Sequence, residues 1–565
     1  MKKIFSTLFF GIFLLLVNPK FLTAQSIQWI HDAGSPSFSA IENGTAVDAD
    51  ASENAYVIGH LSIDSYFSGL FVPANQDGFL AKYNGAGIVQ WVRTFGGIGS
   101  IDIQESAVKV SVEDNAVYVC GAFRTQNFNP TVTFDTISYT YAGNSRHGFL
   151  AKYDLNGNIQ WMKHGGGIGV GASFNDIDID DQGRVVVVGT VDGTNLFDTL
   201  SLNYNGGILL RYLPDGTRTD LIQLNDVSAI HQEAREIEVA SGSGNIYVGG
   251  AFFDNITLNG FTANASVFNV FELKLDSNLT CQWLSSGGGT NGTWINGLAI
   301  DSNENTYITG HASGDTVQFG SQYFNGYTMF DNEIITLKIN AAGTPLWLRH
   351  GGSSVNDEAL DIIADKNGNT IITGFLGGNV LTANFDTVQV AIFTQSTHCF
   401  LARYDPNGTI VYARVMGGGS DDAGSGLTLA NDSTFYFTGT AKSSAPWDVI
   451  VYNPCCLDPN FIVAKFHDTF NSISTGINEF STLNISSFPN PFQSTITLDF
   501  TISAAKNISL SVYDVTGRSL KNIPTQILQK GKNRITVDLS DLNNGIYFCQ
   551  LTSNNEIQTV KLVKQ

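Results

Sequence analysis

The sequence predicts an all-β protein: a seven-bladed β-propeller closed by its N-terminal strand, then a small C-terminal immunoglobulin-like β-sandwich. Three observations predict this fold. A strand-like phrase ending in glycine occurs seven times, a second alternating phrase ends in an aromatic residue, and the last eighty or so residues follow a different strand pattern. Apolar residues alternate along these segments, as they do in half-buried strands. Beyond the first 24 residues, no segment has the apolar spacing of a helix.

The first phrase is a short β-rich run that closes a hairpin. An Asp- and Asn-rich turn precedes it, and these residues favour tight turns. The phrase recurs every 60 to 68 residues, and a fixed period that contains several strands indicates a repeat array. The seven phrases end at Gly59, Gly121, Gly189, Gly250, Gly310, Gly374 and Gly439.

The second phrase forms another hairpin, for example FLAKYDLNGNIQW from Phe149 to Trp161. Two hairpins per period give four antiparallel strands, so seven periods predict seven blades. The aromatic residue occupies one repeat position in six units, and the third unit has Asp220 there. We expect packing between blades from this row, rather than a platform for sugars. The row consists of Trp29, Trp91, Trp161, Trp283, Trp347 and Tyr412.

The two ends of the repeat region predict that the ring is closed. Residues 26–32 contain only the last strand of a unit, whereas the final unit stops after its third strand, at residues 460–468. Pairing of these two segments would complete the seventh blade and protect its edge. The alternative, a stacked solenoid, would need atypical capping repeats at both ends.

The chain divides into four parts by composition. Residues 1–24 have the lysines, short apolar stretch and small residues of a signal peptide, and residues 25–470 hold the repeats. Residues 471–484 form a polar linker, and residues 485–565 form the last domain. The apolar stretch of the signal is too short to span a membrane, and the mature chain has no transmembrane segment. We therefore expect an exported protein.

The charge changes sign between the two large parts. Residues 25–470 contain 19 Lys and Arg against 45 Asp and Glu, whereas residues 485–565 contain 8 against 5. An acidic body argues against nucleic acid as a partner. The six cysteines are too few for a disulfide scaffold. Cys399 could pair with Cys455 or Cys456, but the connectivity stays open.

The repeat region resembles the SBBP repeat family of exported bacterial β-propeller proteins. The resemblance rests on the D-x-x-G-N turn before Y-V-x-G, on a repeated Phe-Asp-Thr step as at residues 134–136, and on the D-G-F-L-A-K-Y and G-x-I-x-W phrases. It covers about residues 26–470 and implies the propeller fold. It implies no single activity, because propellers host many functions.

The last domain resembles the type A C-terminal sorting domain of type IX secretion cargo. It has a P-N-P step near its start, V-Y-D-x-x-G-R, L-x-x-G-I-Y and a basic final strand. The resemblance implies the type IX secretion machinery as a partner, passage through the periplasm, and secretion or attachment at the outer cell surface. It assigns the sorting motif to Pro489, Asn490, Pro491, Gly517, Arg518, Gly545 and Tyr547.

No catalytic or metal site emerges from the sequence. Residues 167–172 fit G-x-G-x-x-A, but no helix follows them as a dinucleotide site requires. Asp176, Asp178 and Asp180 suggest calcium, yet the glycine and glutamate of a calcium loop are missing. We predict no cofactor and leave calcium at some turns as an open alternative.

The function predicted from the sequence is binding or adhesion outside the cell, with a glycan or protein as the unknown ligand. The least repetitive loops, residues 124–146 and 442–460, are the candidate contact regions. Two alternatives stay open: a secreted hydrolase or lyase acting on polysaccharide or peptide at the propeller axis, and a structural surface component.

Overall fold

The computed structural model describes most of the chain beyond residue 25. Several features predicted from the sequence lie outside the described residues: the signal peptide, the linker, Cys455, Cys456, Gly517 and Arg518. Described are residues 26–565 except 36–41, 75–76, 98–100, 126–130, 141–144, 168–170, 227–230, 327–330, 379, 381, 393–395, 419, 443–444, 448–449, 453–459, 469–485, 503–505, 515–518 and 554–555.

Every regular element among these residues is a β-strand, so the all-β class is confirmed. The chain forms two compact units, which divide after Phe470. No helix in the described part is long and apolar enough to cross a membrane.

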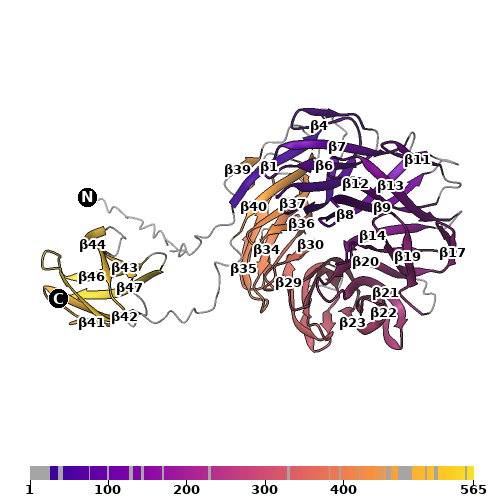
Figure 1. Ribbon diagram of the computed structural model, residues 1–565. Coiled ribbons are helices and arrows are strands. Elements are labelled where there is room, and N and C mark those ends of the chain that lie inside the picture. Colours follow the sequence, from indigo (N-terminus) through magenta and orange to yellow (C-terminus); the bar gives the residue numbers. More distant parts are fainter. Residues whose placement is uncertain are drawn as a thin grey trace, which may run out of the picture. The chain divides into compact units, whose positions relative to one another are not determined.

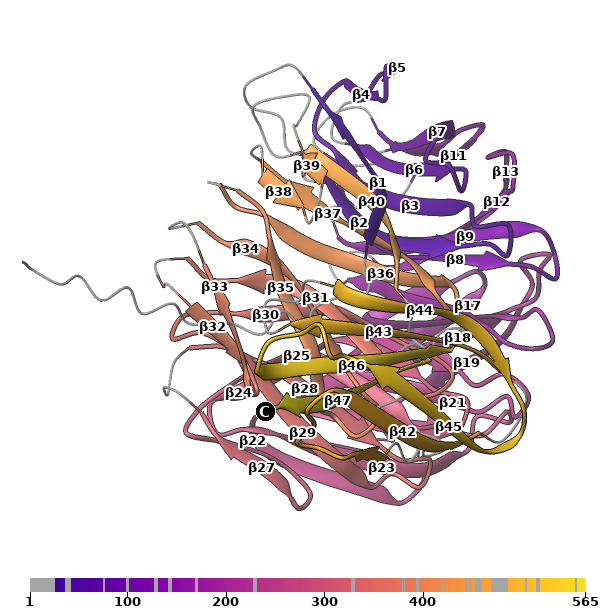
Figure 2. The ribbon, with the colours of Figure 1, turned by 90° about the vertical axis from the view of Figure 1, so that its left-hand side faces the viewer.

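The larger unit contains seven antiparallel sheets, each built on four strands (Figures 1 and 2). Six sheets take all four strands from one continuous stretch of chain. Their strands are β2 (Glu42–Ala49), β3 (Ala55–Leu61), β6 (Asp77–Tyr83) and β7 (Val89–Gly96); β8 (Ile101–Ser111), β9 (Ala116–Thr125), β12 (His147–Asp154) and β13 (Ile159–Gly166); β14 (Ala172–Ile179), β15 (Val185–Val191), β18 (Gly206–Tyr212) and β19 (Arg218–Gln223); β20 (Gln232–Val239), β21 (Ile246–Leu258), β22 (Phe261–Leu275) and β23 (Cys281–Gly289); β24 (Gly292–Ile300), β25 (Thr306–Ser313), β28 (Glu333–Ile339) and β29 (Pro345–Gly352); and β30 (Glu358–Ala364), β31 (Thr370–Leu376), β34 (His398–Tyr404) and β35 (Ile410–Met416).

The seventh sheet joins the two ends of the repeat region. It consists of β36 (Ala423–Asn431), β37 (Thr434–Ala441), β40 (Asn460–His467) and β1 (Ser26–Gly34). Strand β1 pairs antiparallel with β40, with Ile27 opposite Phe466 and Ile30 opposite Ala464. The expected pairing of the N-terminal strand is therefore present.

The first strands of the seven sheets contact one another in turn around a ring. The order is β2, β8, β14, β20, β24, β30 and β36, and β36 contacts β2 again. Apolar residues fill the spaces between successive sheets. One repeat position on each first strand is Val, Ile or Leu and is only 2–6% exposed: Val47, Val108, Ile177, Ile237, Leu298, Ile362 and Leu427. This layer holds the first strands in a common register.

Short hairpins add two further strands to the outer edge of five sheets. Each hairpin lies between the second and third strands of one sheet and pairs with the fourth strand of the preceding sheet. They are β4 (Ser65–Phe67) with β5 (Leu70–Val72), β10 (Thr131–Phe134) with β11 (Ile137–Thr140), β16 (Thr194–Phe197) with β17 (Leu200–Asn203), β26 (Thr316–Phe319) with β27 (Gln322–Asn325), and β32 (Thr382–Phe385) with β33 (Val388–Ala391). Strands β38 (Ala445–Trp447) and β39 (Ile450–Tyr452) form a separate hairpin.

These hairpins change the interpretation of the connections between second and third strands. The described part of residues 124–146 contains β10 and β11, which cover the edge of β7. A covered edge cannot pair with another chain. The Phe-Asp-Thr steps form hairpin tips, where Asp135, Asp198 and Asp386 have φ of 51°, 51° and 53°. Aspartate is one of the few residues other than glycine that adopts this left-handed conformation readily.

The smaller unit consists of two antiparallel sheets around one apolar core. One sheet contains β41 (Ser486–Phe488), β42 (Thr495–Ile502) and β45 (Gly531–Asp538). The other contains β44 (Ser519–Leu528), β43 (Lys506–Asp514), β46 (Gly545–Ser553) and β47 (Glu556–Lys564). Phe492, Leu498, Val512 and Leu562 are among the buried core residues.

Candidate functional site

A cavity of about 580 Å³ lies at the centre of the ring and is lined by the first strands of all seven sheets. Each of these strands carries a β-bulge at the same repeat position. Bulges re-aim side chains and are common beside functional sites. The seven bulge residues all line the cavity: Thr45, Ser106, Asn175, Arg235, Asn296, Leu360 and Ser425. We call this set the bulge ring.

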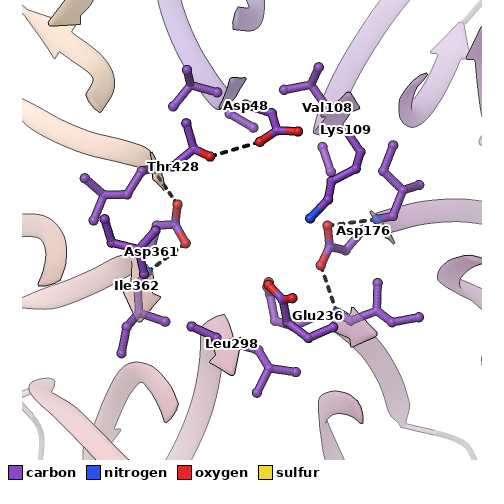
Figure 3. Close-up of a pocket in the computed structure, with 18 of the residues that line it drawn as sticks. Asp48, Val108, Lys109, Asp176, Glu236, Leu298, Asp361, Ile362 and Thr428 are labelled. Atoms are coloured by element: carbon purple, nitrogen blue, oxygen red, sulfur yellow. Dashed lines mark hydrogen bonds between the residues drawn. The ribbon is translucent and has the colours of Figure 1, made fainter. Parts of the chain in front are cut away.

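The residue after each bulge forms a second set, the carboxyl layer. Three of its members are acidic, and Figure 3 shows Asp176, Glu236 and Asp361 pointing into the open centre from three sides. The other four positions carry only small residues, which leave room in the cavity. In full, the layer is Ala46, Ala107, Asp176, Glu236, Gly297, Asp361 and Gly426.

Two of these carboxylates join neighbouring first strands. Asp176 accepts hydrogen bonds from the backbone N–H of Ile177 (2.8 Å) and, on the next sheet, of Ile237 (2.8 Å). Asp361 does the same with Ile362 (2.7 Å) and Leu427 (2.6 Å). The innermost strand of a sheet has an unpaired edge, and these carboxylates satisfy N–H groups on it.

A similar contact joins the first and seventh sheets. Asp48 on the first sheet accepts the hydroxyl of Thr428 on the seventh (2.9 Å) and the backbone N–H of Val110 on the second (2.7 Å). Figure 3 shows the Asp48–Thr428 bond at the edge of the cavity. One carboxylate thus links three consecutive sheets where the first and seventh sheets of the repeat region meet.

The cavity contains more acidic than basic groups. Lys109 points into it but is already paired with Asp178 (2.8 Å), and Arg235 lies 3.5 Å from Glu233. Burial raises the pKa of Asp176 and of Asp361 to about 7. Burial, together with the charges of Asp176 and Asp361, raises the pKa of Glu236 well above its usual value. Near neutral pH the cavity therefore holds protons on part of its carboxyl groups.

The sequence did not single out the bulge ring or the carboxyl layer. The three aspartates considered for calcium do not converge, because Asp176 and Asp178 bind backbone N–H groups of β20 while Asp180 caps its own turn. In the described part of the chain, no group of three or more His, Cys, Asp or Glu residues could hold a metal ion. Aligning the seven repeats would have shown that acidic residues replace Ala or Gly in three of them.

The aromatic row lies away from the cavity and joins successive sheets. The indole N–H of Trp161 donates to the carbonyl of Pro214 in the next sheet (3.0 Å), and four other tryptophans of the row make the equivalent bond. In the third unit, Arg211 pairs with Asp220 and donates to the carbonyl of Ser277 instead. The row is therefore structural.

Some residues of the predicted sorting motif lie near the end of the last strand. The side-chain oxygen of Asn490, between Pro489 and Pro491, accepts the backbone N–H of Val563 (2.8 Å), and Gly545 is opposite Lys564 in the sheet. Tyr547 is buried. The buried ammonium of Lys564 donates to the carbonyls of Leu539 (2.7 Å), Ser540 (3.0 Å) and Leu542 (2.6 Å).

The smaller unit matches a known family. Residues 486–565 are similar to the secretion system C-terminal sorting domain. This sorting domain implies the type IX secretion machinery, and it indicates that the chain is exported and either secreted or held at the cell surface. The localisation predicted from the sequence is confirmed.

One curated protein is similar to part of the chain. An uncharacterized WD repeat-containing protein L264 of Acanthamoeba polyphaga mimivirus is 23% identical over 391 residues, which are 64% of this chain. The chain spans about a quarter of that relative, since the match covers 26% of its length.

Three solved structures are also similar. One is a protein of unknown function from Dyadobacter fermentans (8% identity, TM-score 0.35, 66% of this chain and 98% of that one). Another is a PL25 ulvan lyase (10% identity, TM-score 0.37, 71% of this chain and 92% of that one). The third is PorZ, a surface component of the type IX secretion system of Porphyromonas gingivalis (9% identity, TM-score 0.21, 94% of this chain and 100% of that one). Likenesses this distant say nothing about activity.

Proposed function

We propose that the chain is an exported binding protein whose seven sheets form a closed β-propeller of the SBBP repeat type and whose ligand enters the axial cavity. The C-terminal sorting domain, which has an immunoglobulin-like fold, directs the export of the protein. The ligand is an extracellular glycan or protein, and binding needs no cofactor. The observation that carries the proposal is the cavity itself, because all seven first strands contribute to it and all seven are bulged there. Its volume is typical of ligand sites.

The cyclic contacts of the first strands and the pairing of β1 with β40 support the closed propeller. A rigid ring suits a binding site, because side chains that are already ordered lose little entropy when a ligand arrives. The export signal supports an extracellular ligand.

The proposal is tested by blocking the cavity in the full-length protein. Ser106→Leu combined with Ser425→Leu fills the bulge ring, and leucine fits a bulge because Leu360 occupies one. The matched control is Ser201→Leu with Ser321→Leu, two exposed serines on the outer hairpins. Fluorescence anisotropy would measure binding of labelled soluble polysaccharides and peptides, with and without a chelator. We expect the first pair to abolish binding and the control to retain it; equal binding by both proteins would refute the proposal.

A secreted hydrolase or lyase is the second candidate, favoured by the two carboxyl groups with pKa near 7 beside the cavity. Such values suit general acid–base catalysis near neutral pH. Chain shortening of a bound polysaccharide or peptide that disappears in Asp361→Asn would support catalysis. Saturable binding without shortening supports a binding protein.

A further inference from the structure

We propose that the axial cavity takes a neutral, hydroxyl-rich ligand: a short uncharged oligosaccharide, free or at the end of a polysaccharide. This inference rests on the proposed function and names the ligand class of the same site. It draws on the hydrogen-bonding groups of the bulge ring, the placing of opposite charges along the cavity, and the cavity volume.

The bulge ring offers neutral hydrogen-bonding groups in many directions. Five of its seven members are polar and uncharged, and the hydroxyls of Thr45, Ser106 and Ser425 have no hydrogen-bond partner among the described residues. Asn175 and Asn296 each donate to a backbone carbonyl of the next sheet (2.6 and 3.0 Å), which fixes the amide and leaves its oxygen as an acceptor. A ring of hydroxyls and fixed amides matches a ligand that carries several hydroxyl groups.

An anionic ligand meets like charges in this cavity. Arg235 belongs to the bulge ring and Lys109 lines the cavity further along the first strands, and each already lies against a carboxylate, Glu233 and Asp178 respectively. Between them lies the carboxyl layer, which an anion would face. Like charges placed against a ligand are an effective means of excluding it. An uncharged ligand meets no such penalty.

The carboxyl layer also suits a polyol. Glu236 has no hydrogen-bond partner among the described residues, while Asp176 and Asp361 retain accepting capacity beyond their backbone bonds. Because burial keeps part of these groups protonated near neutral pH, they offer both O–H donors and oxygen acceptors. Sugar hydroxyls need both kinds of partner.

The test is calorimetric titration of the full-length protein with neutral gluco-, galacto- and manno-oligosaccharides of increasing length, a polyamine and an oligouronate. We expect a neutral oligosaccharide to bind and the oligouronate to fail. Competition by the matching long polysaccharide would distinguish a chain-end site from one that admits only short free sugars. If none of the neutral sugars binds, or if the polyamine or the oligouronate binds instead, the inference is wrong.

Two substitutions at one residue separate neutral from charged recognition. Glu236→Ala should weaken sugar binding about tenfold, the usual effect of losing one such hydrogen bond. Glu236→Gln should keep the affinity for the sugar within about threefold, because an amide both donates and accepts hydrogen bonds. A site for cations would lose as much affinity with Gln as with Ala. Alanine occurs at this position as Ala46 and Ala107, so folding should be kept, and Glu113→Ala on an exposed turn is the matched control.

Failure of this inference differs from failure of the proposed function. If neutral sugars do not bind but the bulge-ring leucines abolish binding of another ligand, the cavity is a binding site and only the sugar assignment is wrong. If a sugar binds equally well to the leucine variant, both proposals are wrong.

Discussion

Trp347→Ala should destabilise the ring by an amount that the structure allows us to estimate. The side chain is 6% exposed, and its ring lies 6.0 Å from that of Tyr307 and 6.3 Å from that of Tyr404, in the next sheet. Removing a buried aromatic to alanine costs about 3–5 kcal/mol. The indole N–H also donates to the carbonyl of Pro406 (3.2 Å).

We expect the lower half of that range, about 3–4 kcal/mol. The carbonyl of Pro406 also accepts the ammonium of Lys338 (3.1 Å), so the substitution leaves no unsatisfied group. Trp347→Phe keeps most of the apolar contact and loses the hydrogen bond, which is worth about 1 kcal/mol.

Urea unfolding of the full-length protein, followed by far-ultraviolet circular dichroism, would measure these changes. The control is Leu346→Ala, the neighbouring residue, which is 45% exposed and should change the free energy of unfolding by less than about 0.5 kcal/mol. A loss below about 1 kcal/mol for Trp347→Ala, or an equal loss for the control, would show that the row does not hold the sheets together.

Three other outcomes follow from the structure. The pKa of Asp361 is raised from 3.8 to about 7. Its contribution to the free energy of unfolding is therefore full below pH 4 and is lost as the pH rises through 7. In urea titrations at a series of pH values, Asp361→Asn should flatten this decline. Burial lowers the pKa of His164 from 6.5 to about 4. Its contribution to the free energy of unfolding is therefore full above pH 6.5 and is lost as the pH falls towards 4. His164→Phe keeps the stacking on Tyr139 and should remove that loss in the same titration. Deleting residues 486–565 should leave the protein in the periplasm, and immunoblots of cell fractions that find it outside would contradict its role in export.

The sequence predicted those features that depend on short stretches of chain. Alternating side chains located the strands, and the turn aspartates do what their residue type suggests: Asp301 accepts the N–H groups of Asn303 (2.8 Å) and Asn305 (3.0 Å) in its own hairpin. The incomplete end units predicted that residues 26–32 pair with residues 460–468. The sorting domain was recognisable because its motifs are local and in order.

Other features arise only when distant segments meet. The outer hairpins lie in connections that look irregular in sequence, since their partner strand belongs to the preceding sheet. The bulge ring and the carboxyl layer each depend on seven positions that are spread over nearly 400 residues. Nothing near Asp48 in sequence indicates Thr428, and nothing near Asn490 indicates Val563.

Local side-chain chemistry was thus enough to define strands, turns, period and destination. The cavity, the raised pKa values of its carboxyl groups and the contacts between sheets appear only once the sheets have come together. The physical reason is that alternation and turn preference act over a few residues, whereas burial, the shifted pKa values and the arrangement of hydrogen-bonding groups depend on neighbours contributed by other sheets.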